Sequence, residues 1–250
     1  MENVDTAIIL AAGRGSRLKE LSLEHPKPMT QINDISIIEN LVQNLISQHI
    51  KNIVMVVGYL ADKLKEHLEE RFGAAANMIF VENDIYDKTN NIYSLWLAAE
   101  YMKKGFYLFE ADVFFEEQVL KRLLGHEADD IILIDRYNPE MEGTVVRLDN
   151  HSMVKKMYLK RHQTEDFNFE DTYKTLNFYK ISRNFVESFF MQKLRSHIKR
   201  NDVNSYYELI IKEAIDEGFK FFGLSTEGLK WWEVDTYEDL LKAESIFVLK

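Results

Sequence analysis

The sequence contains no cysteine, which excludes disulfide bonds and any chemistry that needs a thiolate. It also has no run of about 18 consecutive apolar residues, the length that a membrane-spanning helix needs. Its first residues lack the basic and then apolar pattern of a signal peptide. These absences predict a cytoplasmic protein that does not enter a membrane.

Basic residues are in deficit, since 31 Lys and Arg stand against 41 Asp and Glu and give a formal net charge of −10. Because nucleic acid is a polyanion and no dense run of Lys or Arg offsets this charge, nucleic-acid binding is disfavoured. An acidic protein can still bind a small anion where a few cations and a metal ion are concentrated. The acidity is equally explained by solubility alone.

Repeats, low-complexity tracts and linkers rich in Gly, Pro or Ser are also missing. The 250 residues are 46% hydrophobic and can bury one large core, so we expect a single domain over residues 1–250. In the first half, apolar runs alternate with amphipathic segments. Strands are predicted from residue 7 and at 53–59, 78–81, 106–112 and 131–136, with helices at 37–49, 61–72, 90–99 and 116–124.

The pattern changes after residue 136. Short strands at 144–149, 154–159 and 173–181 indicate an antiparallel extension, residues 138–182, within the same domain. We also predict helices at 184–199, 206–216 and 237–247 and a strand at 219–224, which the segment 231–235 follows. The predicted fold class is therefore α/β, with a Rossmann-like, mixed and mainly parallel sheet flanked by helices.

The first strand ends in a turn of small residues and arginines. The turn comprises Leu10, Ala11, Ala12, Gly13, Arg14, Gly15, Ser16 and Arg17. A dinucleotide-binding turn would have a third glycine where Leu18 stands, and a P-loop would need Gly-Lys-Ser/Thr. Two readings remain: a turn whose N–H and guanidinium groups bind a triphosphate, or a turn with only a structural role. In the next loop, a proline on either side of Lys27 restricts its backbone.

This turn, followed by Pro26-Lys27-Pro28, resembles the signature of sugar-phosphate and choline-phosphate nucleotidyltransferases. The resemblance implies a fold of the nucleotide-diphospho-sugar transferase type. It also implies that the turn holds a nucleoside triphosphate, that Arg17 contacts the β and γ phosphates, and that Lys27 stabilises charge at the α-phosphate.

The segment 89–95 resembles the part of choline-phosphate-type cytidylyltransferases that reads cytosine, which implies CTP as the nucleotide. Thr89, Asn90, Asn91 and Ser94 offer donors and acceptors that suit a pyrimidine edge. The two asparagines would equally serve as helix caps. The predicted nucleotide-binding set also includes Ala111, at the end of the strand 106–112.

Four stretches of the second half resemble phosphonate cytidylyltransferases, which couple CTP to 2-aminoethylphosphonate. These stretches are 141–146, 173–180, 206–208 and 231–235. With them the similarity covers nearly the whole chain. The reaction that it implies transfers CMP to the phosphonate and releases pyrophosphate.

Asp112 and Asp235 each follow a predicted strand and offer the oxygen ligands that Mg²⁺ prefers. The resemblance implies that these two aspartates bind the metal. Without the resemblance, the capping of turns would also explain these two aspartates. The predicted catalytic residues are therefore Lys27, Arg17, Asp112 and Asp235, with Mg²⁺ as cofactor.

A primary ammonium on the acceptor would bind carboxylates, for which Asp135, Glu142 and Glu208 are candidates. We predict Lys174 for the phosphonate and Asn177 for orienting it. A quaternary ammonium would instead need aromatic side chains, which packing explains equally well. Those available are Tyr173, Tyr206, Tyr207, Trp231 and Trp232. Two alternatives stay open: a choline-phosphate cytidylyltransferase that makes CDP-choline, and a non-enzymatic module that senses CTP. A homo-oligomer is compatible with all three.

Overall fold

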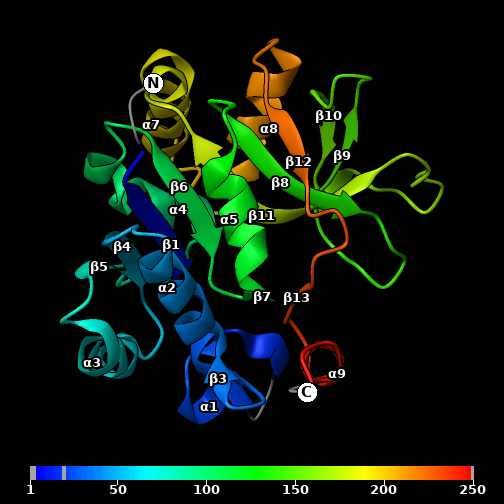
Figure 1. Cartoon of the computed structure of the whole chain (residues 1–250). Coiled ribbons are helices and arrows are strands. Elements are labelled where there is room, and N and C mark those ends of the chain that lie inside the picture. The colour runs from blue at the N-terminus through cyan, green and yellow to red at the C-terminus, as the bar shows by residue number, and fades with distance from the viewer. Residues whose placement is uncertain (1–3, 19–20, 249–250) are drawn as a thin grey trace.

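The computed structural model describes residues 4–18 and 21–248. Among these residues, nine strands form one mixed sheet in the order β10-β9-β11-β6-β1-β4-β5, with β8 beside β11 and β12 beside β8 (Figure 1). At its centre, β1 (Thr6–Ala11) runs parallel to β4 (Asn52–Val57) and to β6 (Phe106–Glu110). The predicted fold class is confirmed.

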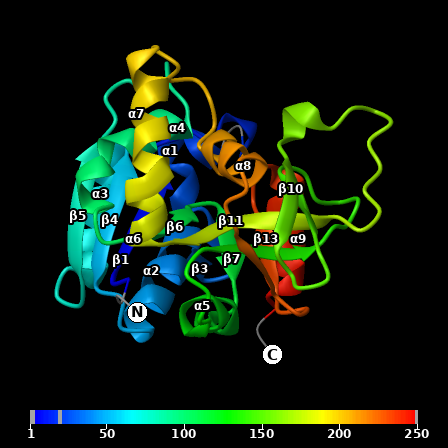
Figure 2. The same cartoon turned by 90° about the horizontal axis from the view of Figure 1, so that it is seen from above.

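Alternate residues of β1 face two different helix layers (Figure 2). Ile8 and Leu10 share a buried cluster with residues of α4 (Asn91–Leu97), α7 (Met191–Lys199) and α8 (Glu208–Asp216). Ala7 and Ile9 belong to a second cluster, with residues of α2 (Ile37–Ser47), α3 (Ala61–Phe72) and α5 (Glu117–Gly125). Because helices cover both faces, the central strands are continuous apolar runs, which made them predictable.

The segment predicted as an antiparallel extension continues the main sheet. Within it, β9 pairs antiparallel with β10, and β11 runs antiparallel to β6, β8 and β9. The remaining sheet strands are β5 (Asn77–Glu82), β8 (Ile131–Arg136), β9 (Val145–Leu148), β10 (Val154–Tyr158), β11 (Tyr173–Ile181) and β12 (Phe222–Ser225). The register of β11 against β8 shifts between Thr175 and Tyr179, and Asn177, with φ +58°, lies in this bulge.

Several short elements were not predicted, because two to four residues are too few to show a hydrophobic period. They are α1 (Leu21–Glu24), β2 (Gln31–Ile32), β3 (Ile35–Ser36) and β7 (Val113–Phe115). The helix predicted at 184–199 consists of α6 (Arg183–Phe185), a π-helical turn, Val186–Phe190, and α7. The strand β13 (Trp231–Glu233) pairs with β7, and α9 (Tyr237–Ile246) packs beside both through Trp232 and Leu240.

The 3₁₀ turns lie at Ser16–Leu18, Lys27–Met29, Ala99–Tyr101 and Lys160–His162. No helix within the described part of the chain is both long and apolar enough to cross a membrane.

Candidate active site

A cavity of about 730 Å³ opens at the carboxyl ends of β1 and β6, where open α/β sheets bind their ligands. Every residue predicted to bind the nucleotide lines it: Leu10, Ala11, Ala12, Gly13, Arg14, Gly15, Arg17, Lys27, Thr89, Asn90, Asn91, Ser94 and Ala111. Asp112, Asp235, Glu142, Asn177 and Glu208 line the same cavity. The fold thus gathers these segments at one place, while their individual roles stay predictions.

The turn after β1 is shaped by its second glycine. Gly15 has φ +66°, and a Cβ built on it would lie 2.6 Å from the Cβ of Lys27. A side chain at this position would therefore be strained and would also displace the lysine. The guanidinium of Arg14 stacks over the ring of Tyr59, 5.5 Å from its centre, at the opening of the turn.

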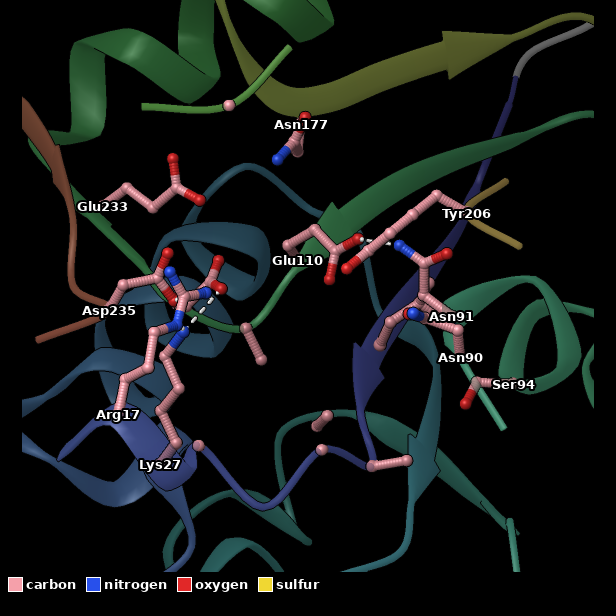
Figure 3. Close-up of a pocket in the computed structure, with 18 of the residues that line it drawn as sticks. Arg17, Lys27, Asn90, Asn91, Ser94, Glu110, Asn177, Tyr206, Glu233 and Asp235 are labelled. Carbon is pink, nitrogen blue, oxygen red and sulfur yellow. Dashed lines mark hydrogen bonds and ion pairs between the residues drawn. The ribbon is translucent and has the colours of Figure 1, made fainter. Parts of the chain in front are cut away.

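Lys27 lies between two carboxylates (Figure 3). Its Nζ donates to Asp112 Oδ2 at 2.8 Å and to Asp235 Oδ1 at 2.6 Å, and Arg17 Nη2 lies 2.9 Å from the same Asp235 oxygen. Burial lowers the pKa of Lys27, but the charges of the two aspartates outweigh it and raise that pKa. Burial raises the pKa of Asp235, but Lys27 and Arg17 outweigh it and hold that pKa below its usual range.

Three carboxylates meet beside this lysine. One ligand oxygen from each of Asp112, Glu233 and Asp235 lies within 4.8 Å of the other two. The second oxygen of Asp112 is buried and has no hydrogen-bond partner among the described residues. An all-oxygen set with a free buried oxygen fits Mg²⁺, which prefers one or two carboxylates together with phosphates.

Glu233 was not predicted as a site residue, although a signal existed. It precedes Asp235 by two positions at the end of β13, and residues two apart on a strand share a face. Its Oε2 forms an ion pair with Lys174 Nζ at 2.8 Å, and burial raises its pKa. Lys174 is only 1% exposed and also donates to the carbonyl of Thr175 at 2.6 Å.

Glu110 was missed for the same reason, since it precedes Asp112 by two positions at the end of β6. The amide nitrogen of Asn91 donates to Glu110 Oε1 at 3.0 Å and to Glu208 Oε2 at 3.3 Å. Figure 3 shows Glu110 near the middle of the cavity with its carboxylate toward Asn91. Burial raises the pKa of Glu110 well above its ordinary value, and the charges of Asp112 and Glu208 add to this.

The predicted cytosine-reading residues lie together at the opposite side of the cavity from Lys27 (Figure 3). Buried Asn83, which the sequence did not single out, donates to Thr89 Oγ1 at 3.0 Å and to Ser94 Oγ at 3.1 Å. Asn90 is the N-cap of α4, where its side chain accepts from the N–H of Asn91. The helix-cap reading of Asn90 is therefore confirmed.

The predicted acceptor residues have different positions. Glu142 lines the cavity and forms an ion pair with Lys160 at 2.9 Å. Lys174 lines a smaller cavity of about 190 Å³ that shares Arg17, Glu233 and Asp235 with the main one. Asp135 lies in neither set of lining residues, and its carboxylate accepts from the indole N–H of Trp231 at 2.7 Å.

Of the described residues that line the main cavity, only Tyr86 and Tyr206 are aromatic, and Tyr206 is 49% exposed. Tyr207 is buried in the core, and Trp231 and Trp232, which are also buried, line the smaller cavity beside Lys174. The cavity wall also includes Thr144, Leu159, Lys160 and Arg161, none of which was predicted to bind a ligand. Thr144 directly precedes β9 and the other three residues follow β10, and only the folded sheet brings them to this place.

A family model described as nucleotidyl transferase matches residues 6–246 of the chain. The chain belongs to this family. It is therefore a nucleotidyltransferase, and the predicted enzyme class is confirmed. The CTP-sensing module considered from the sequence is set aside on this ground.

Three characterised relatives differ in their substrates. The CMP-5'-(3-aminopropyl)phosphonate synthase of Streptomyces rubellomurinus is 30% identical over 96% of this chain and 38% of its own length. The 2-aminoethylphosphonate cytidylyltransferase of Lancefieldella rimae is 30% identical over 61% of this chain and 65% of its length. The choline-phosphate cytidylyltransferase of Streptococcus pneumoniae is 38% identical over 42% of this chain and 44% of its length. The nucleotidyltransferase chain thus spans less than two thirds of each.

Solved structures share the fold. The CTP:phosphocholine cytidylyltransferase from Streptococcus pneumoniae superposes with a TM-score of 0.77 at 22% identity, over 97% of this chain and 99% of that one. A UDP-glucose pyrophosphorylase complexed with UDP-glucose superposes with a TM-score of 0.75 at 14% identity, over 97% of each chain. At these identities, the likeness establishes the nucleotide-diphospho-sugar transferase fold and does not select a substrate.

Proposed function

We propose that this nucleotidyltransferase transfers CMP from CTP to 2-aminoethylphosphonate, giving CMP-2-aminoethylphosphonate and pyrophosphate, with Mg²⁺ as cofactor. The observation that carries the proposal is the meeting of Lys27 with Asp112 and Asp235 at the end of the glycine and arginine turn. The names of the relatives above support CTP and a small phosphonate or phosphate as substrates.

In this reaction, an oxygen of the acceptor phosphonate attacks the α-phosphorus of CTP. A new P–O bond forms, and the bond from the α-phosphorus to the oxygen shared with the β-phosphate breaks, so pyrophosphate leaves with the electron pair. No covalent intermediate with the enzyme is needed. The main difficulty is that two polyanions must meet, so fixed positive charge at the reacting phosphorus is the largest catalytic contribution.

The chain's own residues supply much of this charge. Lys27 is buried and held by two carboxylates, so its ammonium stays charged and fixed beside the place proposed for the α-phosphate. Arg17, whose side chain is 62% exposed, can extend toward the β and γ phosphates. Asp112, Glu233 and Asp235 would hold Mg²⁺, which supplies further positive charge to the phosphates when bound.

The lining of the cavity favours a primary ammonium over a quaternary one. A trimethylammonium group binds best within a cage of aromatic rings. Only Tyr86 and Tyr206 among the described lining residues are aromatic, whereas Glu110, Glu142 and Glu208 place carboxylates there. Choline phosphate remains the second candidate acceptor because of the 38% identity to the pneumococcal enzyme.

Release of pyrophosphate from CTP, with each acceptor in turn, tests the proposal. We expect turnover with 2-aminoethylphosphonate, little with phosphocholine, and a preference for CTP over UTP, ATP and GTP. Turnover with phosphocholine and none with 2-aminoethylphosphonate would overturn the assignment of the acceptor. A preference for another nucleotide would overturn the assignment of the donor.

A further inference from the structure

Two carboxylates of the cavity have no cationic partner. The metal-binding set is balanced by Lys27, Arg17 and Lys174, through four ion pairs of 2.6 to 2.9 Å. Within residues 4–18 and 21–248, neither Glu110 nor Glu208 forms an ion pair, although both line the cavity. The recess between these two glutamates therefore holds two carboxyl groups for which the described residues provide no ion-pair partner.

Asn91 fixes the two glutamates relative to each other. Its amide nitrogen donates to both, at 3.0 Å and 3.3 Å, and its Oδ1 accepts from the N–H of Tyr207 at 2.9 Å. All polar atoms of the Asn91 side chain are thus engaged with the protein. Because it ties α4 to the end of β6 and to the start of α8, Asn91 is a positioning residue for the carboxylates.

The recess is polar, and the residues around it are largely buried. Glu208 is only 6% exposed, and its burial raises its pKa. The hydroxyl of Tyr207 is completely buried and forms no hydrogen bond of good geometry among the described residues, and burial and the neighbouring Glu110 raise its pKa. Burying ionised carboxylates without a partner is costly, and a bound cation would remove most of that cost.

We propose that Glu110 and Glu208, positioned by Asn91, bind the primary ammonium of the acceptor and make the enzyme select aminoalkylphosphonates. The inference rests on the proposed function and assigns the part of the cavity that chooses the acceptor. A primary ammonium has three N–H donors for these carboxylate oxygens, whereas a trimethylammonium has none. An alkyl group without an amine would leave both carboxylates unpaired.

The position of the pair agrees with the length of the acceptor. Glu110 is the last residue of β6, the proposed metal ligand Asp112 follows it by two positions, and both line the same cavity. Two methylene groups separate the phosphonate from the ammonium of 2-aminoethylphosphonate, so its ammonium must bind close to the reacting phosphorus.

The test compares 2-aminoethylphosphonate with ethylphosphonate, which has the same length and no amine. In the wild-type enzyme, we expect kcat/KM to favour the amine about 100-fold, the order of a buried charged hydrogen bond. In Glu208→Gln, this preference should fall to a few-fold, because the KM for the amine rises far more than the KM for ethylphosphonate. Glu110→Gln provides a second variant, and thermal unfolding confirms that each variant is folded.

The control is Glu217→Gln, which removes a carboxylate from a surface ion pair with Lys193 and should keep the full preference. Equal loss with both acceptors, or an unchanged preference in both variants, would overturn the ammonium site. A wild-type enzyme that uses the two acceptors equally would overturn this site and leave the proposed cytidylyl transfer standing. A wild-type enzyme that releases no pyrophosphate with any acceptor would overturn both.

Discussion

A Cβ built on Gly15 would lie 2.6 Å from the Cβ of Lys27, closer than such atoms approach in folded proteins. The turn proposed to bind the triphosphate and the lysine proposed to act at the α-phosphate are therefore packed against each other. In Gly15→Ala, the backbone at φ +66° would also be strained. Both effects move the Lys27 ammonium away from Asp112 and Asp235.

We expect Gly15→Ala to lower kcat about 100-fold or more, because small displacements of a charged catalytic group have effects of this size. Steady-state pyrophosphate release measures it. Gly125→Ala is the matched control, since a Cβ there meets nothing within 4 Å and the backbone is not left-handed. A Gly15→Ala enzyme with normal kcat would show that Lys27 does not depend on this contact.

Removal of the Lys27 ammonium should affect turnover and metal binding in opposite directions. In Lys27→Met, kcat should fall about 100- to 1,000-fold, as when one fixed donor to transition-state charge is removed. The carboxylates of Asp112 and Asp235 would then lack their buried cation. Because the metal would neutralise them, Mg²⁺ should raise the melting temperature of this variant more than that of the wild type.

Thermal unfolding with MgCl₂ and with EDTA provides the comparison for Lys27→Met. Lys63→Met, which removes an exposed lysine that donates to the carbonyl of Glu24, is the control and should respond like the wild type. An Mg²⁺ response of Lys27→Met no larger than that of the wild type would argue against a metal site at these carboxylates.

The strand, the turn and the Lys27 loop of this site could be predicted from the sequence because their signals are local. The apolar strand, the glycine turn and the two prolines around Lys27 are each contiguous in the chain. The hydrogen bonds of Asn91 to Glu110 and Glu208 join side chains up to 117 positions apart in the chain. No local sequence pattern specifies such contacts. Likewise, only the folded structure shows that Lys174 is buried against Glu233 and that Asp135 receives a hydrogen bond from Trp231.

The ion pair between Lys174 and Glu233 should contribute to stability as well as to the site. Lys174 is 1% exposed, so Glu233→Gln would leave a buried ammonium without its counter-charge. Breaking such a pair from one side costs about 3 to 5 kcal/mol. The double variant Lys174→Met, Glu233→Gln should recover part of this loss, because no uncompensated charge remains.

Urea unfolding of the single and double variants measures these free energies. Activity should stay low in the double variant, because the proposed metal-binding carboxylate is still missing. A double variant as unstable as Glu233→Gln alone would contradict the role of the buried charge. Recovery of activity along with stability would remove Glu233 from the metal site.

Because the pKa of Glu208 is raised, we expect its contribution to the free energy of unfolding to change with pH. Burial raises this pKa above the ordinary value of 4.5, so the folded protein holds the proton at pH values where the unfolded chain has lost it. The stabilising contribution of the protonated group is complete below the unfolded pKa and is lost as the pH rises through the folded pKa. Glu208→Gln carries no titrating proton and keeps a similar shape.

The difference in free energy of unfolding, Glu208→Gln minus wild type, should therefore increase as the pH rises above the ordinary pKa of 4.5. A pKa change of one is equivalent to about 1.4 kcal/mol, so urea unfolding at several pH values can resolve it. Saturating 2-aminoethylphosphonate should flatten the curve of the wild type, because the bound ammonium would favour the ionised carboxylate. A difference that stays constant with pH would show that Glu208 titrates normally, and that its recess does not need a cation.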